Sequence, residues 1–228
     1  MTMRNLLDKS GVDRPPRQRE SGWLHTADDA IRDTLRHVVA GLALLFAAAP
    51  LAATSVVHRN LGELIALAEA IVVADVVAVA DGFDGGLPFT EVELDVREAL
   101  LGGSTGRYTF QQFGLLEPRP MTHGRTSALV SPPGWPRFVA GERVLLFLYE
   151  PASRSGLRTT VGLFQGKFIV EGPWIRNEID NAGLFDRLEL PVVAGPDAQR
   201  LARRPGGPLL AEELLDLIRQ AVREQWFE

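Results

Sequence analysis

The sequence predicts a mainly β domain with flanking helices, an α+β fold, over residues 56–228. Several stretches are rich in β-branched residues or alternate between apolar and polar side chains, and glycine-containing turns separate them. Helical spacing of apolar residues occurs only near the two ends of this region. A hydrophobic content of 46% is enough for a single core. We therefore expect one domain.

The first elements of this domain are a short helix and two strands. Residues 60–70 place apolar side chains at helical spacing, with Asn60 as the N-cap. Residues 71–79 are strongly β-branched and predict a buried strand. A flexible turn is expected at 81–86, and the alternation at 89–100 predicts a half-exposed antiparallel strand.

The centre of the domain is predicted to be a group of apolar strands. The expected strands cover residues 107–113, 143–149, 157–163 and 167–171. The run 144–149 is apolar on both faces, which indicates a central strand. Residues 163–166 have the length of a hairpin loop, in which Gly166 would supply a positive φ.

The rest of the chain is predicted to be less regular until its last helix. The segment 114–140 has no strand or helix pattern because five prolines interrupt it, and a loop of this length is often functional. Mixed polarity at 174–190 gives no clear element, and 192–207 is expected to be a loop. A final helix should start at Pro208 and dock through Leu214, Leu217 and Ile218.

The N-terminal region is predicted to be a targeting segment. Residues 37–55 contain an uncharged apolar run that is short for a membrane span and has the length of a signal-peptide core. Cleavage would export the protein to the periplasm or the medium, and an uncleaved segment would anchor it to the membrane. Residues 1–36 are polar and are expected either to be disordered or to lie upstream of the true translation start.

Composition excludes several function classes. The formal net charge of −5 argues against a nucleic-acid-binding protein, which usually has a basic face. The absence of cysteine excludes disulfides and thiolate catalysis. His58 and His123 are the only histidines after the targeting segment, and no HExxH or GxSxG motif is present, so no catalytic residue, metal or cofactor is assigned.

Two motifs resemble those of a known group of proteins. GERVLLFL at 141–148 and GLFQGKF at 162–168 are similar to the GERVLLFL and GLxQGKF motifs of a family of uncharacterised exported bacterial proteins. The strand order more distantly resembles the OB-like antiparallel β-barrel of netrin-type and metalloproteinase-inhibitor-type domains. That resemblance implies an OB-like barrel with a short N-terminal helix and a C-terminal helix. Inhibitors of this type act through an N-terminal cysteine, which this chain lacks.

Five residues are candidates for a binding site. Trp135, Arg137 and Phe138 in the proline-rich loop are of the types that anchor interfaces, although the two aromatic side chains could instead fold the loop back and become buried. Gln165 and Lys167 lie on either side of the hairpin glycine Gly166, and an exposed hairpin lysine is the alternative interpretation for Lys167.

The first functional hypothesis is an exported, non-enzymatic binding domain that contacts a protein or an envelope component through loop 114–140. The motivating observation is that no nucleophile, base and orienting group occur at a recognisable spacing. The alternative is a secreted hydrolase with an unrecognised site. A pocket that brings His123 together with Glu142 or Asp84 would favour the enzyme.

Overall fold

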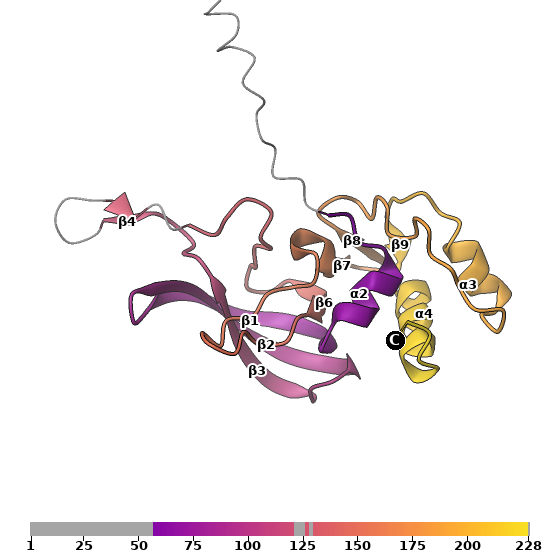
Figure 1. The fold of residues 1–228 in the computed structure, drawn as a ribbon, viewed down its shortest axis with the longest axis horizontal. Helices are drawn as coiled ribbons and strands as arrows, with labels where there is room; N and C mark the ends of the chain where they lie inside the picture. Colours follow the sequence, from indigo (N-terminus) through magenta and orange to yellow (C-terminus); the bar gives the residue numbers. More distant parts are fainter. Residues whose placement is uncertain (1–56, 121–125, 128–129, 228) are drawn as a thin grey trace, which may run out of the picture. The chain divides into compact units, whose positions relative to one another are not determined.

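The computed structural model describes residues 57–120, 126–127 and 130–227 (Figure 1). The predicted segments 1–36 and 37–55 lie outside the described residues. Within the described part, no helix is long and apolar enough to cross a membrane. The elements are α2 (Leu61–Leu67), β1 (Ala70–Asp84), β2 (Leu87–Leu101), β3 (Gly106–Phe113), β4 (Arg119–Pro120), β5 (Thr126–Ser127), β6 (Arg143–Leu148), the 3-10 helix η1 (Leu163–Gly166), β7 (Lys167–Glu171), β8 (Trp174–Asn177), α3 (Pro196–Leu201), β9 (Leu209–Leu210) and α4 (Ala211–Arg223).

Seven of these strands form one sheet in the order β3-β2-β1-β6-β7-β8-β9, and every neighbouring pair is antiparallel. The strands β4 and β5 pair only with each other and lie away from this sheet (Figure 1). The prediction of a mainly β, α+β fold is confirmed.

The hairpin β1–β2 is longer than the sequence pattern indicated. β1 continues through Asp84, and the turn consists of Gly85 and Gly86, which both have positive φ. The prediction of a flexible turn over the whole of 81–86 is therefore wrong. The pairing of Asp81 with Thr90 and of Phe83 with Pro88 extends the hairpin, because backbone ladders can continue through polar residues.

The sheet is apolar on both faces. One face packs against α2 and α4 and carries the larger core, to which Ile71, Leu145 and Phe168 belong. The opposite face carries a second core that includes Val72, Leu94, Phe110, Leu146 and Phe138. Leu214, Leu217 and Ile218 of α4 are all buried, as predicted.

Two further local predictions concern the helices. Asn60 caps α2 as expected, because its side chain accepts from Glu63 N while the Glu63 side chain accepts from Asn60 N. The C-terminal helix begins at Ala211 and not at Pro208, because Leu209 and Leu210 first pair with β8.

The predicted strand at 157–163 is not a strand. Its residues form an isolated bridge, Leu148 with Thr160, and the chain then turns at Gly162 and Leu163, which both have positive φ, into η1. Arg158 N donates to Gln111 O of β3 at 2.7 Å, and Val161 N donates to Phe147 O of β6 at 2.7 Å. This segment reaches the edge strand β3 and the interior strand β6 only through isolated bonds, so the described strands form an open sheet and a closed OB-like barrel is not confirmed.

Gly166 has a different role from the predicted one. It is absent from the residues with positive φ, and a Cβ built on it would lie 2.2 Å from Val161 O. The position needs glycine because the backbone of Val161 passes close to it. β6 and β7 do pair as neighbours, but a connection of irregular chain and η1 joins them in place of a tight turn.

The segment 174–207 contains elements that the sequence did not predict. β8 pairs with β7, and α3 lies inside the expected loop 192–207. Buried amides hold the turn that follows β8. Asn177 Oδ1 accepts from Asn181 N at 2.8 Å, and Asn181 Nδ2 donates to Ile175 O and Gly207 O. Side-chain amides therefore bond backbone groups of β8 and of the segment before β9.

Candidate functional site

The base of loop 114–140 is fixed to the end of β1. Leu116 N donates to Asp81 Oδ2 at 2.8 Å, and Arg119 forms an ion pair with the same carboxylate. The Asp81 side chain is only 7% exposed, whereas the side chain of Arg119 is 47% exposed. Leu115 forms a parallel bridge with Val130, which closes the base of the loop. The β4–β5 ribbon thus projects from a defined anchor.

The returning part of the loop folds over the second core. Phe138 is buried and packs edge-to-face on Phe110, with ring centroids 5.7 Å apart. Trp135 is half-buried and tilts against Phe113 at a centroid distance of 6.2 Å. Burial of the folded-back loop, the alternative given for the two aromatic side chains, thus holds for Phe138. Trp135 is only half-buried and Arg137 is exposed.

Lys167 contacts the returning part of the loop from the interior of the domain. Its side chain is 3% exposed, and Nζ lies 2.8 Å from Glu142 Oε2. The same ammonium donates to the Arg137 carbonyl and lies 4.8 Å from the centroid of the Phe138 ring. The expectation of an exposed hairpin lysine is wrong, because the side chain of this β7 residue enters the second core where Glu142 compensates its charge.

Gln165 is also buried and serves a different segment. Its Oε1 accepts from Arg59 N at 2.8 Å, and its Nε2 donates to Val57 O at 3.0 Å. These bonds fix the chain that leads into α2. Of the five candidates, the structure brings Arg137, Phe138 and Lys167 together, places Trp135 on Phe113, and directs the Gln165 amide to residues 57–59.

One buried amide near the loop is only partly satisfied. Gln112 is 2% exposed, and its Nε2 donates to Pro136 O at 2.9 Å. Its Oε1 has no donor among the described residues. Sequence reasoning missed Gln112 and Asp81 as supports of the loop, because neither the alternating pattern nor the turn composition indicates a contact with a distant loop.

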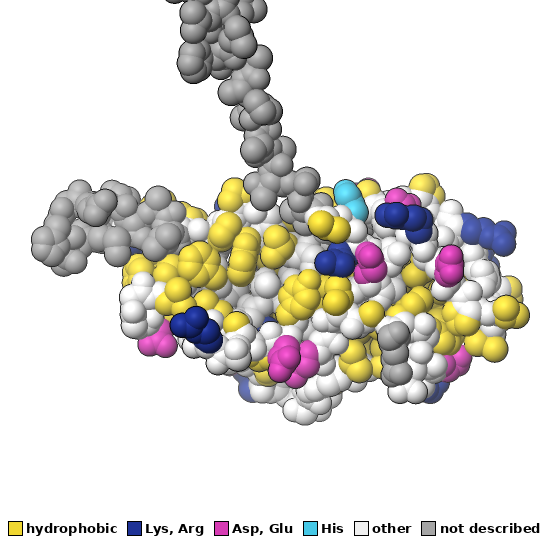
Figure 2. All heavy atoms as spheres, in the orientation of Figure 1, with side chains coloured by type: hydrophobic (Ala, Val, Ile, Leu, Met, Phe, Trp, Pro, Cys, Tyr) yellow, Lys and Arg dark blue, Asp and Glu magenta, His cyan; other side chains and the backbone are white. Residues whose placement is uncertain are grey.

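Apolar side chains remain exposed around the anchored base of the loop. Phe83 is 41% exposed, Leu87 37% and Leu116 44%. We call Phe83, Leu87, Leu116 and the β4–β5 ribbon the loop end. Figure 2 shows hydrophobic side chains gathered on this side of the molecule, next to the grey atoms of the loop. A rigid base with exposed apolar side chains is suited to contact another molecule.

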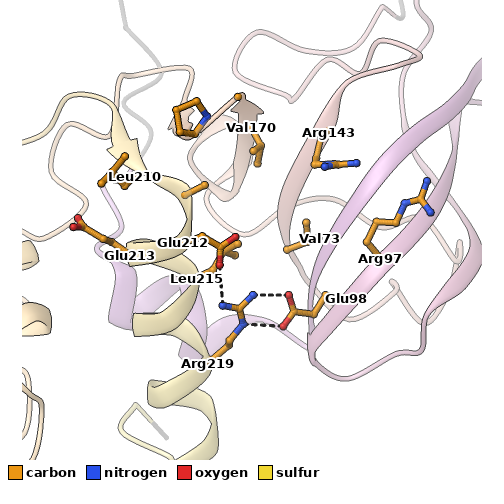
Figure 3. Close-up of a pocket in the computed structure, with 13 residues that line it drawn as sticks. Val73, Arg97, Glu98, Arg143, Val170, Leu210, Glu212, Glu213, Leu215 and Arg219 are labelled. Carbon is orange, nitrogen blue, oxygen red and sulfur yellow. Dashed lines mark hydrogen bonds and ion pairs between the residues drawn. The ribbon is translucent and has the colours of Figure 1, made fainter.

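A groove of about 680 Å³ lies between α4 and the sheet (Figure 3). Arg219 from α4 makes two bonds to Glu98 of β2, at 2.7 and 2.8 Å, and a third to Asp216. The bonds from Arg219 lower the pKa of Glu98, and the same pairing raises the pKa of Arg219. This ion pair joins helix to sheet across the groove.

A second ion pair lies on the other side of the groove. Arg143 and Arg97 both bond Asp75, each with an Nε–Oδ distance of 2.8 Å, and hydrogen bonding from Arg143 is the main cause that lowers the pKa of the Asp75 carboxyl. None of the described residues that line the groove is a histidine, serine or threonine. Each charged side chain that lines the groove has an ion-pair partner, either in the groove or beside it, which is typical of a structural seam.

The described part of the chain holds no cluster of three histidine, cysteine or acidic side chains that could bind a metal ion. His123 lies outside the described residues, so a pocket that joins it to Glu142 or Asp84 is not placed by the structure. Comparisons with models of protein families, with curated proteins and with solved structures found no match.

Proposed function

We propose that this protein is an exported, non-enzymatic binding domain that contacts a protein or an envelope component through loop 114–140. The observation that carries the proposal is the anchored base of this loop. Asp81 fixes both Leu116 and Arg119, and apolar side chains stay exposed beside it.

The anchor matters because binding by a free loop loses the entropy of ordering it. A loop whose base is already fixed loses less, so more of its contact energy appears as affinity. Phe83 and Leu116 supply apolar area at this base, and the half-buried Trp135 and exposed Arg137 add the side-chain types found at the centre of interfaces.

The polar side chains near the loop hold its structure, which supports a binding function over a catalytic one. Glu142, the carboxylate nearest to the returning loop, is paired with Lys167, and Gln112 donates to the loop backbone. Groups that hold structure in this way are not free to take a proton from a substrate. The alternative of a secreted hydrolase would need His123 and a carboxylate other than Glu142.

We also propose that the fold is an OB-like barrel in which the irregular segment 157–161 stands in the place of a strand. The bonds from Arg158 N to β3 and from Val161 N to β6 support this arrangement. Membership of the exported bacterial family rests on the GERVLLFL and GLxQGKF motifs, and export rests on the apolar run within 37–55. That run would be removed as a signal peptide or kept as a membrane anchor.

Affinity capture with matched variants tests the proposed binding function. The tagged protein is recovered from cells that produce it, as wild type and as Phe83→Asp/Leu116→Asp. The control is Val192→Asp/Val193→Asp, which changes two exposed apolar side chains in the segment before α3. We expect a component that is captured by the wild type and the control and lost from the loop-end variant. Equal capture by all three would contradict the proposal.

A further inference from the structure

A second hollow, of about 380 Å³, lies on strands β7 and β8. It is lined by Ile169, Glu171, Trp174, Arg176, Arg204 and Pro208. Trp174 is 47% exposed, which leaves much of its large side chain in contact with solvent. A half-exposed indole over a hollow offers a flat apolar platform for a ligand.

The backbone holds Trp174 rigidly. Gly172 and Pro173 form the turn between β7 and β8, and Gly172 has a φ of 59°. Trp174 pairs with Glu171 on one side and with Leu210 of β9 on the other. Ala211 N also donates to Pro173 O at 2.8 Å. The exposure of Trp174 therefore belongs to a fixed sheet position and not to a loose loop.

Two arginines give the hollow a positive charge. Arg176 meets Glu171 only at 3.5 Å, with both side chains more than half exposed. Arg204 Nη2 donates to the Pro208 carbonyl at 3.3 Å, and Arg204 makes no ion pair among the described residues. Two guanidinium groups face one carboxylate, in a chain whose formal net charge is −5. Guanidinium groups bind carboxylates with two parallel bonds.

We propose that this hollow binds an acidic saccharide, with a sugar ring against Trp174 and the sugar carboxylate on Arg204 and Arg176. A sugar ring has apolar C–H faces and hydroxyl groups around its edge, so it suits a platform that remains half in water. A purely apolar ligand would need deeper burial than this open hollow gives. Glu171 lies where it can accept bonds from hydroxyl groups. The site is separate from the loop end and does not depend on the proposed function.

Calorimetric titration of the purified protein with a trimer of galacturonic acid tests this proposal. We expect saturable binding that is at least tenfold weaker for Trp174→Ala and for Arg204→Gln. The fully methyl-esterified trimer, which has the same rings without charge, should also bind at least tenfold more weakly. Arg203→Gln is the matched control, because it removes an exposed arginine next in sequence that does not line the hollow.

Several results would overturn the proposal. One is the absence of any heat of binding for the wild type, and another is unchanged affinity in Trp174→Ala. A third is an equal loss of affinity in Arg203→Gln and Arg204→Gln. The last would show that the acidic sugar responds only to overall charge. A thermal melt of each variant shows whether it is folded. If Trp174→Ala does not fold, Trp174→Phe takes its place and should retain part of the affinity. Wild-type affinity in both Trp174→Phe and Arg204→Gln would also contradict the proposed site.

Discussion

The returning loop and the turn after β8 are both held by buried polar side chains, but the chemistry of the two regions differs. The loop depends on a charge pair, in which Lys167 reaches Glu142 and the Arg137 carbonyl. The turn depends on neutral amides, in which Asn177 and Asn181 bond each other's backbone and that of neighbouring segments. Each region lacks the continuous strand pairing that stabilises β1 and β2.

This difference predicts how each region responds to change. A buried ion pair is sensitive because loss of one partner leaves the other charge without compensation in the interior. A neutral amide network loses hydrogen bonds one at a time and carries no charge to expose. The loop proposed to bind a partner therefore depends strongly on a single ion pair, whereas the turn after β8 depends on several weaker bonds.

Removal of the buried ammonium should have the largest effect. Lys167→Met leaves Glu142 unpaired beneath the loop and should lower the free energy of unfolding by about 3–5 kcal/mol. Denaturant unfolding measures this loss, and hydrogen exchange should increase first in residues 134–140. Arg107→Met is the control, because Arg107 is 62% exposed in its pair with Glu93 and its loss should be below about 1 kcal/mol. Equal losses in the two variants would show that the buried pair has no special role.

Loss of the central amide should have the next largest effect. Asn181 is fully buried with a φ of 57°, so Asn181→Gly keeps the backbone conformation while it removes the side-chain bonds. We expect a loss of about 2–3 kcal/mol, because backbone groups of Ile175 and Gly207 become unpaired. Asn181→Ala should lose about 1 kcal/mol more through its positive φ. A melting temperature for Asn181→Gly equal to that of the wild type would exclude a structural role of the network.

Gly166 tests the close approach of η1 to Val161. Gly166→Ala should lower stability by about 1–3 kcal/mol, because the new Cβ would overlap a backbone oxygen that cannot move freely. Gly156→Ala is the control, since Gly156 has a φ of 70° and no atom within 4 Å of the added Cβ, so its loss reports the φ penalty alone, about 1 kcal/mol. Thermal denaturation of both variants measures the difference. A smaller loss for Gly166→Ala than for Gly156→Ala would contradict the assigned role.

The smallest expected effect is a pH dependence. Hydrogen bonding from Arg143 holds the pKa of Asp75 below its usual value of 3.8, so the folded pKa lies below the unfolded one. The stabilisation is therefore fully present above the unfolded pKa and is lost as the pH falls through the folded pKa. The loss of unfolding free energy in Asp75→Asn, relative to the wild type, should be constant from pH 7 to about 4 and should become smaller at lower pH. The loss of unfolding free energy in Asn181→Gly, which involves no titrating group, should not change in this way. If the losses in the two variants showed the same dependence on pH, this account would be contradicted.

The sequence predicted the parts of the fold that depend on local periodicity. The alternation in β2, the N-cap at Asn60 and the buried face of α4 all follow from residue type and spacing within a single element. β8 and the segment 157–161 were not predicted correctly, because contacts with distant residues decide their structure. Arg158, for example, is buried against Tyr108 and Glu69, which no local pattern shows.

The candidate site was predictable in position but not in detail. The prolines indicated a long loop at 114–140, and the residue types indicated Trp135 and Arg137. The burial of Lys167 could not be predicted, because a lysine is buried only where a distant partner compensates it, and here that partner is Glu142. Trp174 was missed because it lies in a segment of mixed polarity whose strand pairing depends on β7 and β9.

Site-specific photo-cross-linking tests the central claim, binding through the loop end, most directly. A photoreactive residue is placed at Leu116 or, for comparison, at Val192, which is fully exposed elsewhere in the domain. Cells that produce the protein are irradiated, and adducts are identified by mass spectrometry. The account predicts one discrete adduct from position 116 that position 192 does not form. No adduct from position 116, or the same adducts from both positions, would contradict it.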